Sequence, residues 1–171
     1  MRVGAGFCRW GPNDGGANEF AATTSHCRPA PTPGLAGVSS GSLPSILKRP
    51  PLSDAQLNAL FAAAWPDHEP RAFGPVLERS LVYCAAFDGA RLIGYVNVAG
   101  DGGEHAFLLD PTVHPEFRRR GLGSALVRAA VQAAADAGAT WMHVDFEPHL
   151  APFYRALGFR HTEAGLLRLG G

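Results

Sequence analysis

The chain has 171 residues, which suits one domain with a sizeable core and some additional length. Fifteen basic residues balance fifteen acidic ones, so the formal net charge is zero. This balance argues against a general nucleic-acid binder or a membrane-surface protein, because both derive affinity from excess positive charge. Fourteen of the basic residues are arginines and Lys48 is the single lysine, so only the placement of the arginines is informative.

The cysteines and the hydropathy pattern indicate the cellular compartment in which the protein is expected. Cys8, Cys27 and Cys84 are odd in number and form no Cys-x-x-Cys pair, so neither a disulfide framework nor a metal site is indicated. No apolar stretch has the length of a signal peptide or a membrane span. We therefore expect a cytoplasmic protein that binds no metal and no membrane.

The composition changes near residue 50. Residues 1–50 are rich in Gly, Pro, Ser, Ala and Thr without helical or strand periodicity, which predicts a disordered or linker-like segment. One hypothesis is that this segment includes upstream sequence and that translation starts later, for example at Val38. Residues 51–171 are predicted to form the folded domain.

Regular patterns begin after Leu52. Ser53 is a good N-cap, Asp88-Gly89 is a hairpin turn signal, Gly94 suggests a bulge, and Gly138 suits a helix end. The predicted elements, in chain order, are helices over 53–65 and 72–80, strands over 81–87, 91–99 and 105–110, a helix over 122–137, a strand over 140–146, a helix over 149–157 and a hairpin over 159–169.

This order predicts the fold class. Three successive strands joined by short turns form an antiparallel meander, and a strand–helix–strand crossover follows it. The crossover requires the strands 105–113 and 140–146 to be parallel. We therefore expect an α/β fold with a mixed sheet, and with helices on both faces.

The stretch PEFRRRGLGSALV, residues 115–127, is typical of an anion-binding turn. Glycines at a helix start let successive N–H groups point at an anion, and the helix dipole favours negative charge there. A Walker loop is excluded because Gly-x-x-x-x-Gly-Lys is absent, and a dinucleotide fingerprint fails because Leu126 takes the third glycine position. A short nucleic-acid patch or a solvated turn would explain the arginines but not the glycines.

The pattern Arg118-x-x-Gly121-x-Gly123, following Val113-His114-Pro115, resembles the coenzyme A loop of the GNAT superfamily of N-acetyltransferases. Leu-Ile-Gly at 92–94 resembles the third strand of that family, and FYRALGF at 153–159 is similar to its FYxxLGF signature. The resemblance covers about residues 52–169. It implies transfer of an acetyl group from acetyl-CoA to a primary amine by direct attack, in a GNAT-like fold whose first crossover strand splays from its parallel neighbour.

The resemblance also implies site residues. Those implied to bind acetyl-CoA through the main chain or the arginine side chains are Thr112, Val113, Arg118, Arg119, Arg120, Gly121, Leu122, Gly123 and Ser124. Tyr154 matches the position that protonates the departing thiolate. Glu147 stands where many members of the family carry Asn, which is a departure at a cofactor contact.

The base that deprotonates the amine is not given by the resemblance. Asp110 and Asp145 end neighbouring parallel strands at the same edge, and mutual repulsion there could raise one pKa. Asp145 or Glu147 could instead cap the following helix, and His143 could be hydrogen-bonded within the core.

The acceptor stays open between a small-molecule amine and a peptide or protein amine, and acidic residues within 53–80 would favour a cation. The alternative function is a coenzyme A-binding sensor or interaction module without turnover. The protein is expected to be a monomer or homodimer that binds no nucleic acid.

Overall fold

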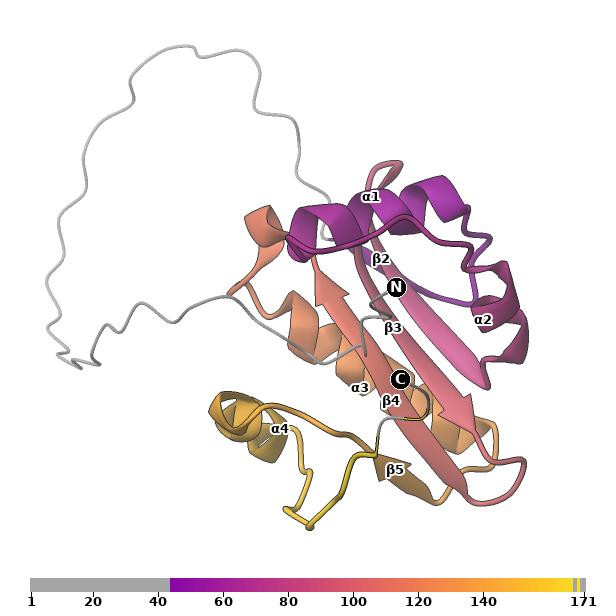
Figure 1. The fold of residues 1–171 in the computed structure, drawn as a ribbon, viewed down its shortest axis with the longest axis vertical. Coiled ribbons are helices and arrows are strands. Elements are labelled where there is room, and N and C mark those ends of the chain that lie inside the picture. The colour runs from indigo at the N-terminus through magenta and orange to yellow at the C-terminus, as the bar shows by residue number, and fades with distance from the viewer. Residues whose placement is uncertain (1–43, 168, 170–171) are drawn as a thin grey trace, which may run out of the picture. The chain divides into compact units, whose positions relative to one another are not determined.

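The structure is a computed structural model that describes residues 44–167 and 169 (Figure 1). The interpretations of residues 1–43, including Cys8, Cys27 and the later start, lie outside the described residues. The elements, in chain order, are β1 (Ser45–Lys48), α1 (Asp54–Ala64), α2 (Gly74–Arg79), β2 (Val82–Asp88), β3 (Arg91–Gly100), β4 (His105–Val113), the 3-10 turn η1 (Pro115–Phe117), α3 (Leu122–Asp136), β5 (Trp141–His143), the 3-10 turn η2 (Pro148–Leu150) and α4 (Ala151–Ala156).

The strands form one sheet in the order β1-β2-β3-β4-β5. Neighbouring strands from β1 to β4 are antiparallel, and β4 pairs with β5 in parallel. The predicted meander and crossover are therefore confirmed. Strand β1 lies within the last residues of the segment 1–50, so regular structure begins before residue 51. The four residues of β1, SILK, are too few to show a periodic pattern in the sequence.

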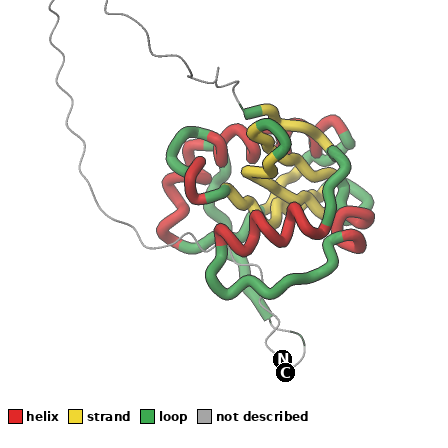
Figure 2. Tube along the Cα trace, turned by 90° about the horizontal axis from the view of Figure 1, so that it is seen from above, coloured by secondary structure: helices red, strands yellow, loops and turns green. Residues whose placement is uncertain are grey.

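Helices cover both faces of the sheet, as Figure 2 shows from above. Helix α3 packs against β1 to β4, whereas α1 contacts β3 and β4 on the opposite face. On the α3 face, Gly94 allows close approach, because a Cβ there would lie 2.6 Å from Leu126 Cδ1. The core on the α1 face consists of buried side chains from α1, β2, β3 and the N-cap of α2: Leu57, Leu60, Phe61, Phe73, Tyr83, Ala85, Leu92 and Tyr95.

Local sequence signals explain where the helices begin and end. Ser53 forms a capping box with Gln56 at the start of α1. Gly121 precedes α3 with φ +81°, and Gly138 follows it with φ +98°, a backbone region that glycine adopts without steric cost. The helix predicted over 122–137 is thus confirmed to within one residue.

Strand β4 is irregular near its end. The register with β3 shifts between Tyr95 and Asn97, so that two residues of β4, Asp110 and Pro111, lie opposite the single residue Val96 of β3. Asp110 has φ +52°, so the chain turns locally into the left-handed region. A β-bulge of this kind bends the strand and redirects its side chains.

Three predictions near the C-terminus differ from the structure. The hairpin predicted over 159–169 is wrong, because the described residues in that range form no strand. Strand β5 is three residues long instead of seven, since the chain leaves the sheet after His143. The helix predicted over 149–157 is split into η2 and α4.

Candidate active site

The two parallel strands of the crossover stay paired over a short distance only. His105–Phe107 pair with Trp141–His143, and β4 then continues to Val113 with β3 as its single neighbour. The chain after β5 runs away from β4 towards α4 (Figure 1). One edge of β4 from Leu108 onwards is therefore without a strand partner, which agrees with the splay that the resemblance implied.

The hydrogen-bond alternation of β4 shows which main-chain groups face that edge. The N–H of His114 donates to the Ile93 carbonyl oxygen over 2.8 Å, so these two residues form a hydrogen-bonded pair. Antiparallel ladders alternate, so Tyr95 with Thr112 is the next such pair and Gly94 with Val113 is not. The main-chain polar groups of Val113 thus point away from β3, and those of Thr112 point towards it.

Arg118 is held by the protein itself. Its Nε donates to the Val113 carbonyl oxygen over 3.2 Å, and its Nη2 donates to the Ala64 carbonyl oxygen at the end of α1 over 3.1 Å. Burial lowers the pKa of the Arg118 guanidinium. In the structure this side chain therefore connects the turn to β4 and to the end of α1, whereas the resemblance implied that it contacts the cofactor.

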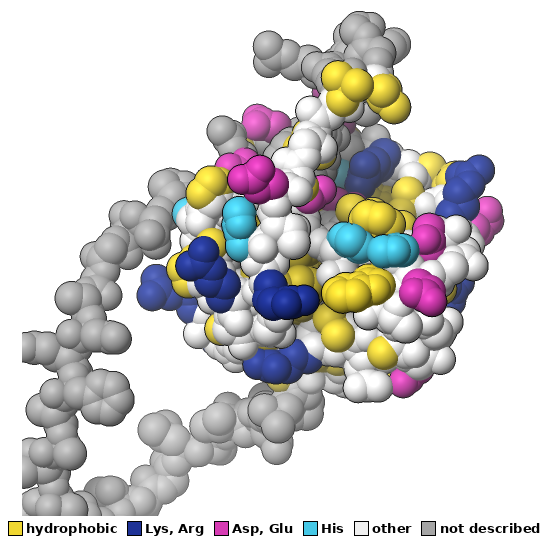
Figure 3. Space-filling view, turned by 90° about the horizontal axis from the view of Figure 1, so that it is seen from below, with side chains coloured by type: hydrophobic (Ala, Val, Ile, Leu, Met, Phe, Trp, Pro, Cys, Tyr) yellow, Lys and Arg dark blue, Asp and Glu magenta, His cyan; other side chains and the backbone are white. Residues whose placement is uncertain are grey.

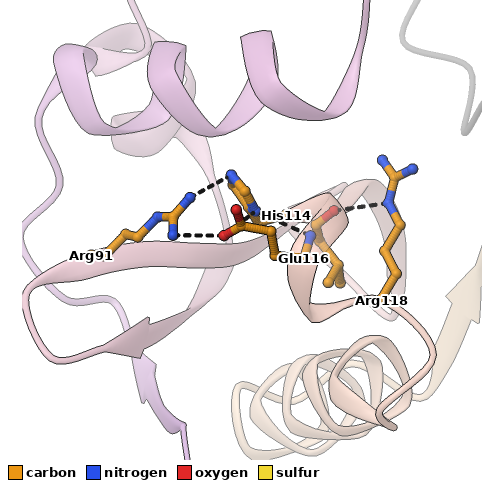
Figure 4. A network of polar contacts seen from close by, with 5 residues as sticks. Arg91, His114, Glu116 and Arg118 are labelled. Atoms are coloured by element: carbon orange, nitrogen blue, oxygen red, sulfur yellow. Dashed lines mark hydrogen bonds and ion pairs between the residues drawn. The ribbon is translucent and has the colours of Figure 1, made fainter.

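A second tie fixes the other side of the same turn (Figure 4). Arg91 contacts Glu116 Oε2 over 2.8 Å and His114 Nε2 over 2.7 Å. Because a guanidinium only donates, the Nε2 atom of His114 is the acceptor of this contact. Burial first, and Arg91 second, lower the pKa of His114. The Val-His-Pro sequence thus forms a rigid entry to the turn.

The turn itself exposes main-chain N–H groups. Arg119 and Gly121 both have positive φ, at +61° and +81°, and α3 starts without a side-chain cap. The first N–H groups of a helix have no intrahelical partner, so those of 122–124 are oriented for an anion. Arg119 is exposed, and the guanidinium carbon of Arg120 lies 5.6 Å from the ring centroid of Phe117.

Gly123 is where three elements meet. A Cβ on this residue would lie 3.7 Å from Val113 Cγ2 and 3.8 Å from Phe153 Cζ. The end of β4, the start of α3 and helix α4 are thus brought together, although the two sequence motifs are about thirty residues apart. Tyr154 follows Phe153 directly.

Tyr154 lies in an aromatic cluster and is 1% exposed. Its ring stacks on Phe146, with centroids 4.5 Å apart, and packs edge-on against Phe153 and Phe159. The FYRALGF motif therefore fixes the orientation of this ring through its own aromatic members.

The two predicted carboxylates differ in their environments. Asp110 is largely buried, and its Oδ2 lies 3.7 Å from Arg71 Nη2. Burial raises the pKa of the Asp110 carboxyl, and Arg71 acts in the opposite direction. Asp145 is exposed beyond the end of β5. The cause of the raised pKa is thus burial, and the expected repulsion between the two carboxylates is not the source.

The alternative interpretations of the neighbouring residues are also answered. Glu147 is the N-cap of η2 but makes no capping hydrogen bond, and helix α4 begins after Leu150. His143 is exposed and not in the core. Its Nε2 lies 2.8 Å from His105 Nδ1, and its ring stacks on Phe107 at 4.9 Å. Histidine and hydrophobic side chains lie next to one another on the face in Figure 3.

Sequence reasoning missed the residues on the α1 side of β3. Tyr95 and Asn97 are 0% and 4% exposed and point to the same face, where Arg71 reaches Asp110. The main chain of Arg71 is clamped by Asn58, whose side chain bonds both its N–H and its carbonyl oxygen over 2.9 Å. The available signal was Asn97 itself, because asparagine is uncommon in a strand as apolar as VNVA.

Two further observations concern the described part of the chain. Within residues 44–167 and 169, no group of three or more His, Cys, Asp or Glu is arranged to hold a metal ion. None of the helices in the same residues is long and apolar enough to cross a membrane.

Similar proteins place this geometry in context. Residues 52–159 match the acetyltransferase (GNAT) family. A mycothiol acetyltransferase from Mycolicibacterium vanbaalenii is 41% identical over 78 residues, which is 46% of this chain and 25% of that protein. An uncharacterised N-acetyltransferase from Pyropia yezoensis is 30% identical over 70 residues, 41% of this chain and 40% of that protein. The chain thus aligns with less than half the length of these relatives.

Among solved structures, a GNAT-family acetyltransferase from Streptococcus pneumoniae TIGR4 superposes with a TM-score of 0.63 at 26% identity, covering 75% of this chain and 98% of that one. The aminoglycoside N-acetyltransferase AAC(6')-Iy in complex with CoA, at 23% identity and a TM-score of 0.61, shares the fold over 78% and 98% of the two chains. The family match spans more than half of the sequence, and the splayed crossover strands agree with it: this chain belongs to the GNAT family of acetyltransferases.

Proposed function

We propose that this protein transfers the acetyl group of acetyl-CoA to a primary amine by direct attack. The observation that carries the proposal is the position of the unpaired edge of β4. That edge ends at Val113, and the uncapped first turn of α3 follows after η1. A chain-like ligand with a phosphorylated end can pair along the edge and place its phosphates at the helix N-terminus.

The residues of the turn fit the pyrophosphate of acetyl-CoA. The N–H groups of 122–124 would bind it, with Arg119 and Arg120 adding positive charge at the exposed surface. Gly121 holds the turn open through its positive φ. Arg118 would act indirectly, by fixing the turn relative to β4 and α1.

The main chain of β4 would hold the arm that carries the acetyl group. When bound, acetyl-CoA supplies an activated thioester. The Val113 carbonyl oxygen is already engaged by Arg118, so its N–H is the group left to bind the pantetheine arm or to polarise the thioester carbonyl. Thr112 instead supports the bulge, since its hydroxyl donates to the Asp110 carbonyl oxygen over 3.0 Å.

Proton transfer would be divided between Asp110 and Tyr154. The amine nitrogen bonds to the carbonyl carbon, the carbon–sulfur bond breaks, and the nitrogen loses a proton while the sulfur gains one. Asp110, with a pKa raised by burial, suits the base. Tyr154 suits the acid. Because a thiol has a pKa near 8.5, the thiolate is a tolerable leaving group and this acid contributes modestly.

The test combines acetyl-CoA binding with thiol release. Calorimetric titration with acetyl-CoA is followed by a thiol-release assay with simple alkylamines, peptides, polyamines and aminoglycosides. The last class is included because a similar protein is named for it. We expect binding and turnover with at least one primary amine. Binding without turnover would favour a coenzyme A-binding module, and absence of binding would refute both functions.

Tyr154→Phe separates catalysis from packing. We expect kcat to fall on the order of 10- to 100-fold, because one proton-transfer contribution is lost. The acetyl-CoA affinity should stay close to that of the wild type, since phenylalanine preserves the stack with Phe146. An equal loss of affinity and turnover would show that Tyr154 acts through packing alone.

A further inference from the structure

Two buried polar atoms lack partners on the face of the sheet that carries α1. In residues 44–167 and 169, the buried side-chain nitrogen and oxygen atoms without a hydrogen bond are the Tyr95 hydroxyl oxygen and Asn97 Oδ1. Such atoms cost folding free energy unless a ligand or water completes them. They are neighbours, because residues two apart on a strand share a face.

A carboxylate belongs to the same part of the sheet. Asn97 is the register partner of Leu109, so Asp110 begins at the same level of the sheet. The Phe61 ring links Tyr95 to this carboxylate: its centroid lies 6.0 Å from that of Tyr95 and 5.7 Å from the guanidinium carbon of Arg71, the side chain that reaches Asp110. Burial first, and the Asp110 charge second, raise the pKa of the Tyr95 hydroxyl. Leu109 is 41% exposed, so solvent reaches this part of the face.

The cation now beside Asp110 comes from the protein. Arg71 Nη2 is 3.7 Å from Asp110 Oδ2, and its guanidinium carbon is 4.7 Å from the Phe73 ring centroid. The contact to the carboxylate is longer than a hydrogen bond, and the Arg71 side chain is 46% exposed. A second cation with better geometry could therefore take its place.

We propose that the Tyr95 hydroxyl, Asn97 Oδ1 and the Asp110 carboxylate form a cradle for the acceptor's primary ammonium group, and that Arg71 occupies this position until the acceptor arrives. A primary ammonium has three N–H donors, which matches three oxygen acceptors. The negative charge of Asp110 balances its positive charge. The name acceptor rests on the proposed acetyl transfer, whereas cation binding itself can be measured separately.

Binding is tested without turnover by NMR titration. The side-chain carboxamide signals of Asn97 are assigned with the variant Asn97→Ser and followed during addition of butylammonium chloride. Tetramethylammonium chloride is the matched control, because it carries the same charge but no N–H donor. We expect saturable shifts with butylammonium alone. Equal shifts with both salts, or no shift with either, would overturn the cradle.

Tyr95→Phe and Tyr83→Phe form a matched pair of variants. Tyr83 lies on the same face of β2, but its hydroxyl already donates to the Pro50 carbonyl oxygen over 2.9 Å. We expect the Kd of butylammonium to rise on the order of tenfold for Tyr95→Phe, since one hydrogen bond to a charged group is lost, and to stay unchanged for Tyr83→Phe. Thermal stability should show the reverse order, with Tm lowered in Tyr83→Phe and not in Tyr95→Phe.

The outcomes separate this inference from the proposed function. If Tyr95→Phe binds butylammonium as the wild type does, the cradle is wrong even when the wild type acetylates amines. If butylammonium binds in the cradle but no amine is acetylated, the transferase proposal fails and the cation site stands. Arg71→Gln should tighten butylammonium binding and Arg71→Lys should not, and weaker binding in Arg71→Gln would refute the stand-in role of Arg71.

Discussion

Gly94→Ala is expected to destabilise the protein through one defined contact. The new Cβ would lie 2.6 Å from Leu126 Cδ1 and 3.4 Å from Ala86 Cβ. Leu126 is 1% exposed, so its Cδ1 can move away only by shifting against other buried side chains. Overpacking in a closed core costs about 1–3 kcal/mol, and we expect this loss in the free energy of unfolding. Urea denaturation measures it, with a fall in Tm of several degrees as a second readout.

Gly74→Ala is the matched control. It also adds one methyl group, but a Cβ at Gly74 meets no atom within 4 Å and the residue lies in the first turn of α2. We expect a stability within about 1 kcal/mol of the wild type, because the higher helix propensity of alanine is opposed by the steric restriction that Pro75 places on a preceding residue with a Cβ. If Gly94→Ala unfolds at the same urea concentration as the wild type, α3 is not held at its present distance by this contact, and the reasoning is refuted.

Two further predictions concern the turn before α3. Gly121→Ala should cost about 1–2 kcal/mol, because its φ of +81° is unfavourable for a residue with a Cβ, and it should weaken acetyl-CoA binding in calorimetry; unchanged affinity would contradict the role of this turn. Arg118→Ala should lower the free energy of unfolding by about 1–3 kcal/mol, because the carbonyl oxygens of Val113 and Ala64 lose a charged donor. The urea midpoint should fall accordingly. A wild-type midpoint in Arg118→Ala would mean that the two bonds are not formed in solution.

The order of elements was predictable where local chemistry and tertiary structure agree. Ser53 caps the start of α1 through its side chain, and Gly138 ends α3 through its positive φ. Both predictions were confirmed. The hairpin over 159–169 failed for the opposite reason. Alternating residues form a strand only beside a partner, and Leu166 and Leu167 are instead exposed, at 65% and 84%.

The candidate site was predictable in its backbone but not in its side chains. Glycine spacing identifies the turn, because positive φ is a local property. The role of Arg118 depends on Ala64, which is more than forty positions away in the sequence. The role of Arg71 depends on Asp110, which is nearly forty positions away. No local pattern carries such contacts. The bulge that turns Asp110 towards Arg71 is likewise a property of the pairing of β3 with β4.

Asp110 lies in the β4 bulge, belongs to the proposed ammonium cradle and affects the stability of the fold. Its replacement by asparagine tests these roles together. Burial raises the pKa of this carboxyl in the folded state above its unfolded value, so the folded protein binds the proton more tightly. The contribution of Asp110 to stability is therefore greatest below the unfolded pKa, about 4, and falls as the pH rises through the raised folded value.

Asp110→Asn removes this titration, and asparagine tolerates the left-handed φ of +52°. The variant should be more stable than the wild type at pH 7, converge with it in acid, and lose amine acetylation. The measurements are the urea midpoints of both proteins at pH 7 and in acid, together with the turnover of amine acetylation. A less stable variant at pH 7 would mean that the Arg71 pair outweighs burial and that Asp110 is a structural anchor for the loop.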